Sequence, residues 1–439
     1  MTHVAEQRSS AISRVSRMAI LAGVLVLGSF AAEMAQGQTL QVLHSFTGGS
    51  DGQYPFAGLT IDRAGNLYGT TAYGGNFGGA CGPQQSFSGC GTVFKLTHRG
   101  SGWTFAPLYA FKGFAYDYDA ANPAARVVFG PDGSLYGTTA SGGYGSCRYF
   151  GYGCGTVFKL SPPATVCKTV LCPWTDTVLY DAAQDSGEDL SGDVVFDSAG
   201  NLYSTVALGG GLNADDYVFE LTPSNGGWTS QVIYSFIPND VDCTNPMAGL
   251  VFDASGNLYG TANNGCGQLY GGVFQLSPSE SGWTENILLR FNGIGNGDGS
   301  EADLTPDGHG GFFGTTVDLG PSSGGTVFNL TPSDGGWAYS LVYGFGVRDG
   351  AYPTAPVTLD ASGNLYGTTG KTAVDSGNGL VFELSPSNGG WTETVLHYFL
   401  GTDGLYPSSN VVMDANGNLY GTTSQGGDYG YGVVWEITP

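Results

Sequence analysis

The chain has 439 residues, 75 of them glycine, and carries 14 Lys and Arg against 37 Asp and Glu. It lacks a Gly-x-y period, which excludes collagen, and its 41 % hydrophobic and 13 % aromatic content excludes a disordered glycine-rich tract. The formal net charge of −23 excludes nucleic acid as a partner, because nucleic-acid binding needs clustered Lys and Arg.

The first 37 residues are predicted to form an export signal. Arg8, Arg14 and Arg17 precede an apolar run over residues 18–32, and Ala35-Gln36-Gly37 resembles a cleavage site. The run is shorter than the roughly 20 residues of a membrane-spanning helix. We therefore expect a mature chain of residues 38–439, secreted or periplasmic, without a membrane span. Removal of the signal makes the net charge one unit more negative.

Seven copies of one unit follow. Asn66-Leu67-Tyr68-Gly69-Thr70-Thr71 recurs along the chain, at steps of 53 to 68 residues. The aromatic residue of each copy is Tyr68, Tyr136, Tyr203, Tyr259, Phe313, Tyr366 or Tyr420. Repeats of this length predict a solenoid or a propeller.

Each copy contains four strand-like segments. In the fourth copy these are residues 248–253, 257–261, 272–276 and 283–291, which are bounded by Gly, Pro, Asn, Asp or Ser. Large apolar residues occupy both faces of the last segment of each unit, as residues 391–399 illustrate. This is expected of a sheet that packs between two others, and four antiparallel strands per unit form a propeller blade.

The two ends of the repeat array complement each other. The last copy stops after its third strand, at residues 433–437, whereas residues 40–46 resemble the fourth strand at 394–399. The N-terminal strand is therefore expected to complete the last blade and protect its edge. The predicted fold is all-β: one domain over residues 38–439, a seven-bladed β-propeller of about 28 strands, four to each blade.

The repeat also resembles a known family. The Asn-Leu-Tyr-Gly-Thr-Thr motif is followed by Gly-Thr-Val-Phe-Lys-Leu at 91–96 and 155–160, and by Gly-Gly-Trp-Thr at 389–392. Together these resemble the GloVer tandem repeat of exported bacterial proteins of the choice-of-anchor type, over nearly all of residues 40–439. The resemblance implies an extracytoplasmic, propeller-like protein and no established reaction. Some members carry a C-terminal sorting anchor, and none is seen before Thr438-Pro439.

The eight cysteines suggest disulfide bonds, because an even count is typical of exported proteins. Register within the repeat and shared loops favour four pairs: Cys81 with Cys90, Cys147 with Cys154, Cys167 with Cys172, and Cys243 with Cys266. Metal binding is the alternative. It lacks both Cys-x₂-Cys spacing and nearby histidines.

No catalytic residues are predicted, since no metalloprotease or hydrolase motif occurs. An aspartate follows each first strand, and its sevenfold recurrence favours turn capping over catalysis. These residues are Asp62, Asp132, Asp197, Asp253, Asp307, Asp360 and Asp414.

The loops from each fourth strand into the next blade are the candidate binding surface. They are variable, rich in acids and aromatics, and contain Asp-Gly-x-Tyr-Pro three times. Aspartate and tyrosine together suit hydroxyl recognition and stacking on sugars, and turn chemistry is the competing explanation. The candidate residues are Asp51, Tyr54, Asp119, Asp242, Asp349, Tyr352, Asp403 and Tyr406.

One weak calcium candidate is present, and no other cofactor is expected. Asp298, Glu301 and Asp303, together with Asn296, are clustered oxygen donors, but their spacing differs from that of the EF-hand loop.

Three functions remain open. The leading hypothesis is an exported monomer that binds a glycan or an envelope protein through its loop face without catalysis. The alternative is a hydrolase or lyase acting on polysaccharide or lactone, which predicts one cluster of acids at the mouth of the central channel. A structural surface protein would instead form multimers.

Overall fold

The computed structural model describes residues 38–76, 81, 89–100, 102–113, 119–144, 153–163, 174–182, 190–207, 216–237, 242–267, 269–346, 349–371 and 377–438. The predicted export signal, residues 1–37, lies outside them. Leu40–Ile437 form one compact unit; Met1–Thr39 and Thr438–Pro439 form the other. Of the smaller unit only residues 38, 39 and 438 are described, and the hydroxyl oxygens of Thr39 and Thr438 lie 2.9 Å apart.

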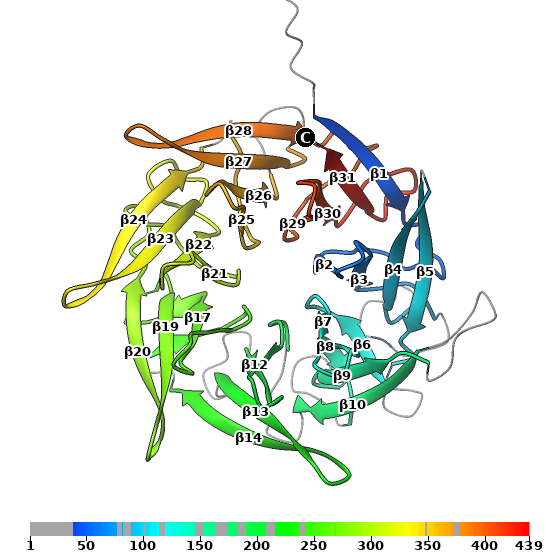
Figure 1. The fold of residues 1–439 in the computed structure, drawn as a ribbon, viewed down its shortest axis with the longest axis horizontal. Helices are drawn as coiled ribbons and strands as arrows, with labels where there is room; N and C mark the ends of the chain where they lie inside the picture. The colour runs from blue at the N-terminus through cyan, green and yellow to red at the C-terminus, as the bar shows by residue number, and fades with distance from the viewer. Residues whose placement is uncertain are drawn as a thin grey trace, which may run out of the picture. The chain divides into compact units, whose positions relative to one another are not determined.

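The larger unit is an all-β propeller whose seven blades are arranged in a ring (Figure 1). Each blade is an antiparallel sheet of four strands, and the described residues contain no helix. The predicted fold class is confirmed. Three short strands, β6 (Ala120–Pro123), β15 (Cys243–Thr244) and β18 (Asn264–Gly265), are additions to the blades in the described part of the chain.

The strand bounds follow the repeat. Blade 1 contains β2 (Leu59–Ile61), β3 (Leu67–Thr71), β4 (Thr92–Arg99) and β5 (Gly102–Ala110). Blade 2 contains β7 (Val128–Phe129), β8 (Leu135–Gly142), β9 (Thr156–Ser161) and β10 (Thr175–Asp181). Blade 3 contains β11 (Val195–Phe196), β12 (Leu202–Val206), β13 (Asp216–Ser224) and β14 (Gly227–Phe236).

Blade 4 contains β16 (Val251–Phe252), β17 (Leu258–Ala262), β19 (Gly272–Ser279) and β20 (Gly282–Arg290). Blade 5 contains β21 (Thr305–Pro306), β22 (Phe312–Thr316), β23 (Thr326–Ser333) and β24 (Gly336–Gly344). Blade 6 contains β25 (Thr358–Leu359), β26 (Leu365–Thr369), β27 (Leu380–Ser387) and β28 (Gly390–Tyr398). Blade 7 contains β29 (Val412–Met413), β30 (Leu419–Thr423), β31 (Val433–Thr438) and β1 (Thr39–Ser45).

The first strands are shorter than the sequence predicts, and blade 4 shows why. Residues 248–250 precede β16 instead of belonging to it. The carbonyl oxygen of Ala248 accepts a hydrogen bond from Thr205 Oγ1 of blade 3 at 2.9 Å. The backbone at this point therefore bonds to the neighbouring blade rather than within its own sheet.

The second strand explains why the repeat retains one glycine. Gly69 lies beneath the buried ring of Phe94, and a Cβ atom there would come within 2.6 Å of that ring. The same distance is 2.4 Å between Gly314 and Phe328 in blade 5. Since protein interiors are close-packed, a side chain at this position would crowd the ring, and blade 3 has only the small Ser204 there, opposite Phe219.

The threonine that follows this glycine connects neighbouring blades. Thr138 Oγ1 donates to the carbonyl of Gly192 at 3.0 Å, and Thr368 Oγ1 donates to that of Ser409 at 2.9 Å. Four more threonines make the equivalent bond: Thr70, Thr205, Thr261 and Thr315. At the seventh junction, Thr422 Oγ1 is buried with no hydrogen-bond partner among the described residues.

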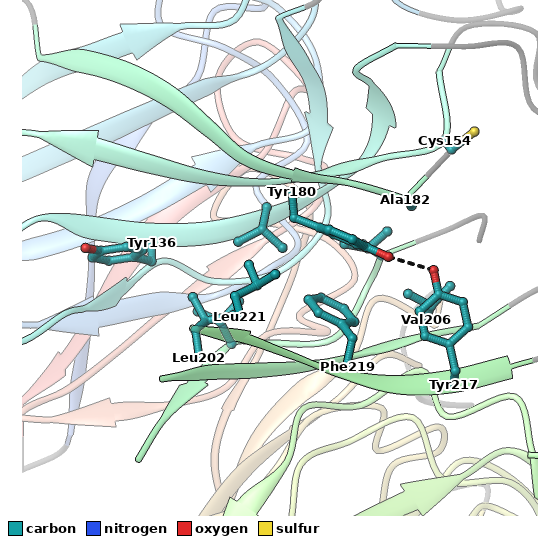
Figure 2. Packing of buried hydrophobic residues seen from close by; sticks show 12 residues of the cluster. Tyr136, Cys154, Tyr180, Ala182, Leu202, Val206, Tyr217, Phe219 and Leu221 are labelled. Atoms are coloured by element: carbon teal, nitrogen blue, oxygen red, sulfur yellow. Dashed lines mark hydrogen bonds between the residues drawn. The ribbon is translucent and has the colours of Figure 1, made fainter. Parts of the chain in front are cut away.

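The Gly-Gly-Trp-Thr motif also serves packing between blades. Its tryptophan begins the outer strand and contacts the repeat tyrosine of the preceding blade. Trp337 lies 5.8 Å from Tyr259 between ring centroids, and Trp103 lies 5.6 Å from Tyr420 across the junction of blades 1 and 7. Figure 2 shows the core between blades 2 and 3, where Tyr180 stacks on Phe219 at 4.6 Å.

The aspartate turns match the prediction, with one shift. Asp62 Oδ1 accepts the backbone N–H groups of Ala64 and Asn66 at 2.8 and 2.9 Å. In blade 2 the equivalent position is Gly130, and Asp132 two residues later accepts the N–H of Ser134 at 3.0 Å instead. These carboxylates therefore hold hairpin turns.

The N-terminal strand closes the ring as predicted, because β1 pairs with β31 in blade 7 (Figure 1). On the channel side, a side chain joins blade 7 to blade 1. The Asn410 amide accepts the N–H of Leu59 at 3.0 Å and donates to the carbonyl of Leu59 at 3.2 Å. The preceding residue is Gly58, where a Cβ atom would lie 1.9 Å from Asn410 Oδ1.

Replacement of Asn410 by alanine is expected to lower the free energy of unfolding by about 2 kcal/mol, because two buried backbone groups of Leu59 lose their partners. Asn410→Asp is the informative companion, since it keeps an acceptor and loses the donor. Denaturant unfolding of the two variants measures the effect, and alanine without any loss would contradict the assigned closure.

Candidate functional site

The loops that enter each blade and the loops that follow each second strand lie at one end of the propeller. Gln53 and Tyr73 exchange backbone hydrogen bonds at 2.9 and 3.2 Å, which joins the two loops of blade 1. The bridge between Ala351 and Lys371 does the same in blade 6. We call this end the loop face.

The candidate aspartates of the loop face hold turns. Asp403 Oδ1 accepts the N–H of Leu400 at 2.7 Å, and its Oδ2 lies 2.8 Å from His397 Nε2. Asp51 has the equivalent contacts with the N–H of Thr47 at 2.9 Å and with His44 Nε2 at 3.1 Å. Although burial opposes it, these hydrogen bonds lower the pKa of Asp51 to about 2.

At three blade junctions the turn aspartate meets a tyrosine and a second carboxyl group. Tyr343 Oη lies 2.7 Å from Asp349 Oδ2 and 3.0 Å from Glu393 Oε2 of blade 6. Because one hydroxyl carries one proton, a proton on a carboxyl group is needed to satisfy both contacts. Burial raises the pKa of Glu393 to about 7, and the hydrogen bond from Tyr343 offsets this only in part.

The other two junctions repeat this arrangement. Tyr109 Oη donates to Asp119 Oδ2 at 2.9 Å, and burial together with Asp119 raises the pKa of Asp176 well above its usual range. Asp242 accepts the N–H of Ile237 at 3.1 Å. Burial, followed by the Asp242 charge, raises the pKa of Glu285 to about 7. We call these three sets the carboxyl junctions.

The candidate tyrosines have an unusual backbone. Tyr54, Tyr352 and Tyr406 adopt positive φ angles of 58°, 62° and 55°. The equivalent residues Asn122 and Asn245 have φ of 56° and 59°, so the position requires a left-handed conformation. The Tyr54 N–H donates to the carbonyl of Tyr431 in blade 7 at 3.0 Å, so this backbone also connects two blades.

The tyrosine rings reach the surface of the loop face. Tyr54 contacts Tyr73 and Tyr431 edge-to-face, at 5.9 and 6.5 Å between ring centroids. Tyr429, two residues before Tyr431, is 59 % exposed. Tyr352 instead has the Lys371 ammonium 4.7 Å from its ring centroid. The eight candidates are therefore distributed over five loops between blades.

The calcium candidates have different hydrogen-bond partners. Asp298 exchanges backbone hydrogen bonds with Asp318, Asn263 donates to Glu301 Oε1 at 2.9 Å, and Gly249 N–H donates to Asp303 Oδ1 at 2.6 Å. Within the described ranges, no group of three or more His, Cys, Asp or Glu side chains is arranged to hold a metal ion.

A constriction of the central channel is the feature that the sequence analysis missed. It is formed by the residue ten positions before each repeat aromatic residue. These are Arg126, Asp193, Gly249, Asp303, Pro356 and Asn410, which line the channel, and Gly58, which packs against Asn410. We call this set the channel ring. Unlike the core positions of the repeat, it differs from blade to blade.

Three charged members of the channel ring meet each other. Arg126 bonds through Nε to Asp193, and its Nη2 lies 3.1 Å from Asp303 Oδ2. The Asp193 charge raises the pKa of Arg126 despite burial. Burial raises the pKa of Asp193, although Arg126 lowers it. The two carboxylates therefore depend on one guanidinium from a third blade.

The channel ring separates two chambers. The chamber at the loop face has a volume of about 330 Å³, and the wider chamber on the other side has about 800 Å³ and is lined by first-strand residues such as Val195 and Phe252. The residue two positions before each ring residue lines the smaller chamber. These are Phe56, Ala124, Ser191, Met247, Glu301, Thr354 and Ser408. We call the smaller chamber the channel mouth.

A signal for the channel ring was present in the sequence. When the seven copies are aligned on the repeat aromatic residue, the positions ten and twelve residues before it carry dissimilar side chains amid constant ones. Both positions precede the first strand of their blade, and residues at both positions line the channel.

Two of the four predicted disulfides are confirmed. Cys81 bonds to Cys90 in the loop after β3, and Cys243 bonds to Cys266, which joins β15 to the residue after β18. Cys147, Cys167 and Cys172 lie outside the described residues, so the two pairings that involve them stay predictions.

Comparison with known proteins identifies the repeat. A family model described as a Gloeobacter/Verrucomicrobia repeat matches residues 28–267, 144–371 and 190–435. Comparison with curated proteins gives no match. None of the described segments forms a helix with the length and apolar character needed to cross a membrane.

Among solved structures the chain is similar to other proteins at low identity. A proposed 6-phosphogluconolactonase from Bacteroides uniformis is 16 % identical with a TM-score of 0.44, over 75 % of this chain and 84 % of that one. A Dyadobacter fermentans protein of unknown function is 12 % identical with a TM-score of 0.43, over 92 % and 100 %. A Trypanosoma rangeli sialidase is 11 % identical with a TM-score of 0.43, over 78 % and 56 %.

Proposed function

The chain belongs to the Gloeobacter/Verrucomicrobia repeat family, and we propose that it is a binding module that recognises a glycan through its loop face. The observation that carries this proposal is the placement of Tyr54, Tyr352 and Tyr406 at the rim of three blades. Tyrosine offers a flat apolar ring with a polar end, which suits the mixed surface of a sugar. Rings repeated around a rigid frame suit a ligand made of repeated units.

The turn-capping aspartates contribute less than the sequence suggests. Their carboxylates are committed to backbone N–H groups and to histidine or tyrosine side chains, as at Asp51, Asp349 and Asp403. The proposal therefore rests on the tyrosine rings, with the aspartates fixing the loops that present them.

Replacement of Tyr54, Tyr352 and Tyr406 by asparagine is expected to weaken glycan binding about tenfold, as one stacking contact of about 1.4 kcal/mol would require. Asparagine is chosen because Asn122 and Asn245 already hold this backbone position. A glycan array identifies the ligand, and calorimetry with that ligand measures the loss. Matched phenylalanine variants keep the rings and should retain binding.

Two results would contradict the proposal. One is the absence of any glycan ligand on the array, together with binding to envelope proteins, which would make the partner a protein. The other is a triple asparagine variant that binds as tightly as the unchanged chain.

A hydrolase or lyase acting on polysaccharide or lactone is the second candidate, because two acids from different blades, Asp193 and Asp303, converge at the channel ring. Against it, Arg126 pairs with both Asp193 and Asp303. Assays on a panel of such substrates, with and without calcium, test this candidate. Turnover that Asp303→Asn abolishes would favour it over the binding module.

We also propose that residues 1–37 are an export signal and that residues 38–439 work outside the cytoplasm as a monomer. The two disulfides support this location, since such bonds persist in oxidising compartments. Mass spectrometry of the secreted N-terminus and sedimentation of the mature chain test it. A chain that still contains the signal, or a multimer without ligand, would contradict it.

A further inference from the structure

The residues that line the channel mouth differ among the seven copies of the repeat, unlike those that build the blades. Positions that build the blades recur as Gly, Thr and Phe, because the glycine lies under the aromatic ring and the threonine bonds to the next blade. In the channel ring, Asp193, Asp303 and Asn410 each accept a backbone N–H group of a neighbouring blade. The seven residues that line the mouth differ in size and polarity from blade to blade. Among them, Phe56, Met247 and Glu301 occupy one repeat position in three blades.

The mouth has the size of a site for one small molecule. Its volume of about 330 Å³ lies at the lower end of the range for ligand pockets, about 300 to 1,000 Å³. Arg126 and its two aspartates form the floor, since they also line the chamber beyond. An oligosaccharide or a peptide does not fit inside this volume, whereas a single sugar ring does.

The charge of the mouth is negative. Asp193 and Asp303 share one guanidinium, and Glu301 lines the same chamber with Asn263 donating to only one of its oxygens. Even with Asp193 protonated, the remaining carboxylates outnumber the single cation. Anionic ligands are therefore repelled, and a ligand ammonium group is attracted.

Neutral groups complete the lining. Ser191, Thr354 and Ser408 place hydroxyl groups at the mouth, and Thr354 Oγ1 is buried without a partner among the described residues. Phe56, which is 38 % exposed, and Met247 add apolar surface. Hydroxyls, an apolar patch and a free carboxylate oxygen match a ring that carries hydroxyl groups and an amine.

We propose that the channel mouth is a subsite for an amine-bearing sugar ring, with Glu301 as the residue that receives the ammonium group. This inference rests on the proposed glycan-binding function and names one subsite of it. The ring would enter from the loop face and stop at Arg126.

Calorimetric titration of the full chain with glucosamine, glucose and glucuronate at neutral pH tests the subsite. We expect glucosamine to bind at least tenfold more tightly than glucuronate, and Glu301→Gln to weaken glucosamine about tenfold. Asp298→Asn is the matched control, because it removes an equal charge three residues away and Asp298 does not line the mouth. It should leave glucosamine binding unchanged.

The results distinguish the subsite from the proposed function. Absence of glucosamine binding, or equal binding by the Glu301→Gln variant, overturns the subsite, while the asparagine variants of the loop tyrosines still test glycan binding independently. Glucosamine binding that depends on Glu301, with no glycan bound on the array, would support the subsite and overturn the proposed function.

Discussion

The temperature midpoint of unfolding is expected to fall by about 5 °C when the pH is raised from 5 to 8. The cause lies in the carboxyl junctions, where burial raises the pKa of Glu285 and of Glu393 to about 7 and that of Asp176 well above its usual range. Each group binds its proton more tightly in the folded chain. The stability that Glu285 and Glu393 contribute is therefore fully present below about pH 4.5 and is lost as the pH rises through 7, and the contribution of Asp176 changes in the same direction.

The opposite sign holds for the turn aspartates. Hydrogen bonds lower the pKa of Asp51 to about 2 against the effect of burial, so its contribution is present above about pH 4 and is lost as the pH falls through 2. The protein should consequently be most stable near pH 5. Because Glu285 and Glu393 remain partly exposed, solvent screening limits the loss to about 1 kcal/mol per group by pH 8.

Two variants isolate the cause. Glu393→Gln keeps an acceptor for the Tyr343 hydroxyl without a charge, so it should raise the midpoint at pH 8 and leave it unchanged at pH 5. Glu280→Gln, an exposed residue in a turn of blade 4, should change neither value. Differential scanning calorimetry between pH 4 and pH 9 measures these shifts. A midpoint that rises from pH 5 to pH 8 would show that the carboxyl junctions do not control stability.

Replacement of Arg126 by methionine is expected to cost about 3 kcal/mol of unfolding free energy, because Asp193 and Asp303 then lose their shared counter-charge. The Arg126 side chain is 31 % exposed to the channel, which keeps the loss below that of a fully buried pair. Gly249 packs against both aspartates, since a Cβ atom there would lie 2.8 Å from Asp193 Cβ and 2.9 Å from Asp303 Oδ1.

Rescue distinguishes charge from packing. Adding Asp193→Asn and Asp303→Asn to the Arg126→Met variant removes the repulsion and should restore most of the lost stability. Chemical denaturation at neutral pH provides the comparison. If the triple variant is no more stable than Arg126→Met alone, the guanidinium contributes by filling the channel rather than by its charge.

The fold could be predicted because its determinants are repeated. A single glycine under an aromatic ring, as at Gly69 and Phe94, says little in one copy. Its recurrence in six of seven copies, with Ser204 in the third, makes a pattern, and the matching of residues 40–46 to a missing fourth strand identifies the closure. The shortened first strands were not predictable, because the carbonyl of Ala248 bonds to Thr205 of another blade and local propensity carries no information about that contact.

The candidate site was harder to predict than the fold, because the residues of the channel ring are not constant in the repeat. The acids and tyrosines of the loops were found because Asp-Gly-x-Tyr-Pro recurs, yet recurrence in this protein mostly marks structural roles. Arg126, Asp193 and Asp303 meet at the channel from blades 2, 3 and 5, and each is an unremarkable single residue in its own copy. The positions that recur in the repeat indicate the fold, whereas the channel ring lies at positions that vary among the copies.

The pairing of β1 with β31 affects the order in which the blades can assemble during synthesis. Synthesis produces Thr39–Ser45 first and Val433–Thr438 last, so the first strand made must wait for the last before it has a neighbour. Six blades can assemble in that interval, each from adjacent segments, while one unpaired strand edge remains available to other chains. The ring is therefore most exposed to misassembly just before completion, and a chaperone that shields a single β-edge would protect it there.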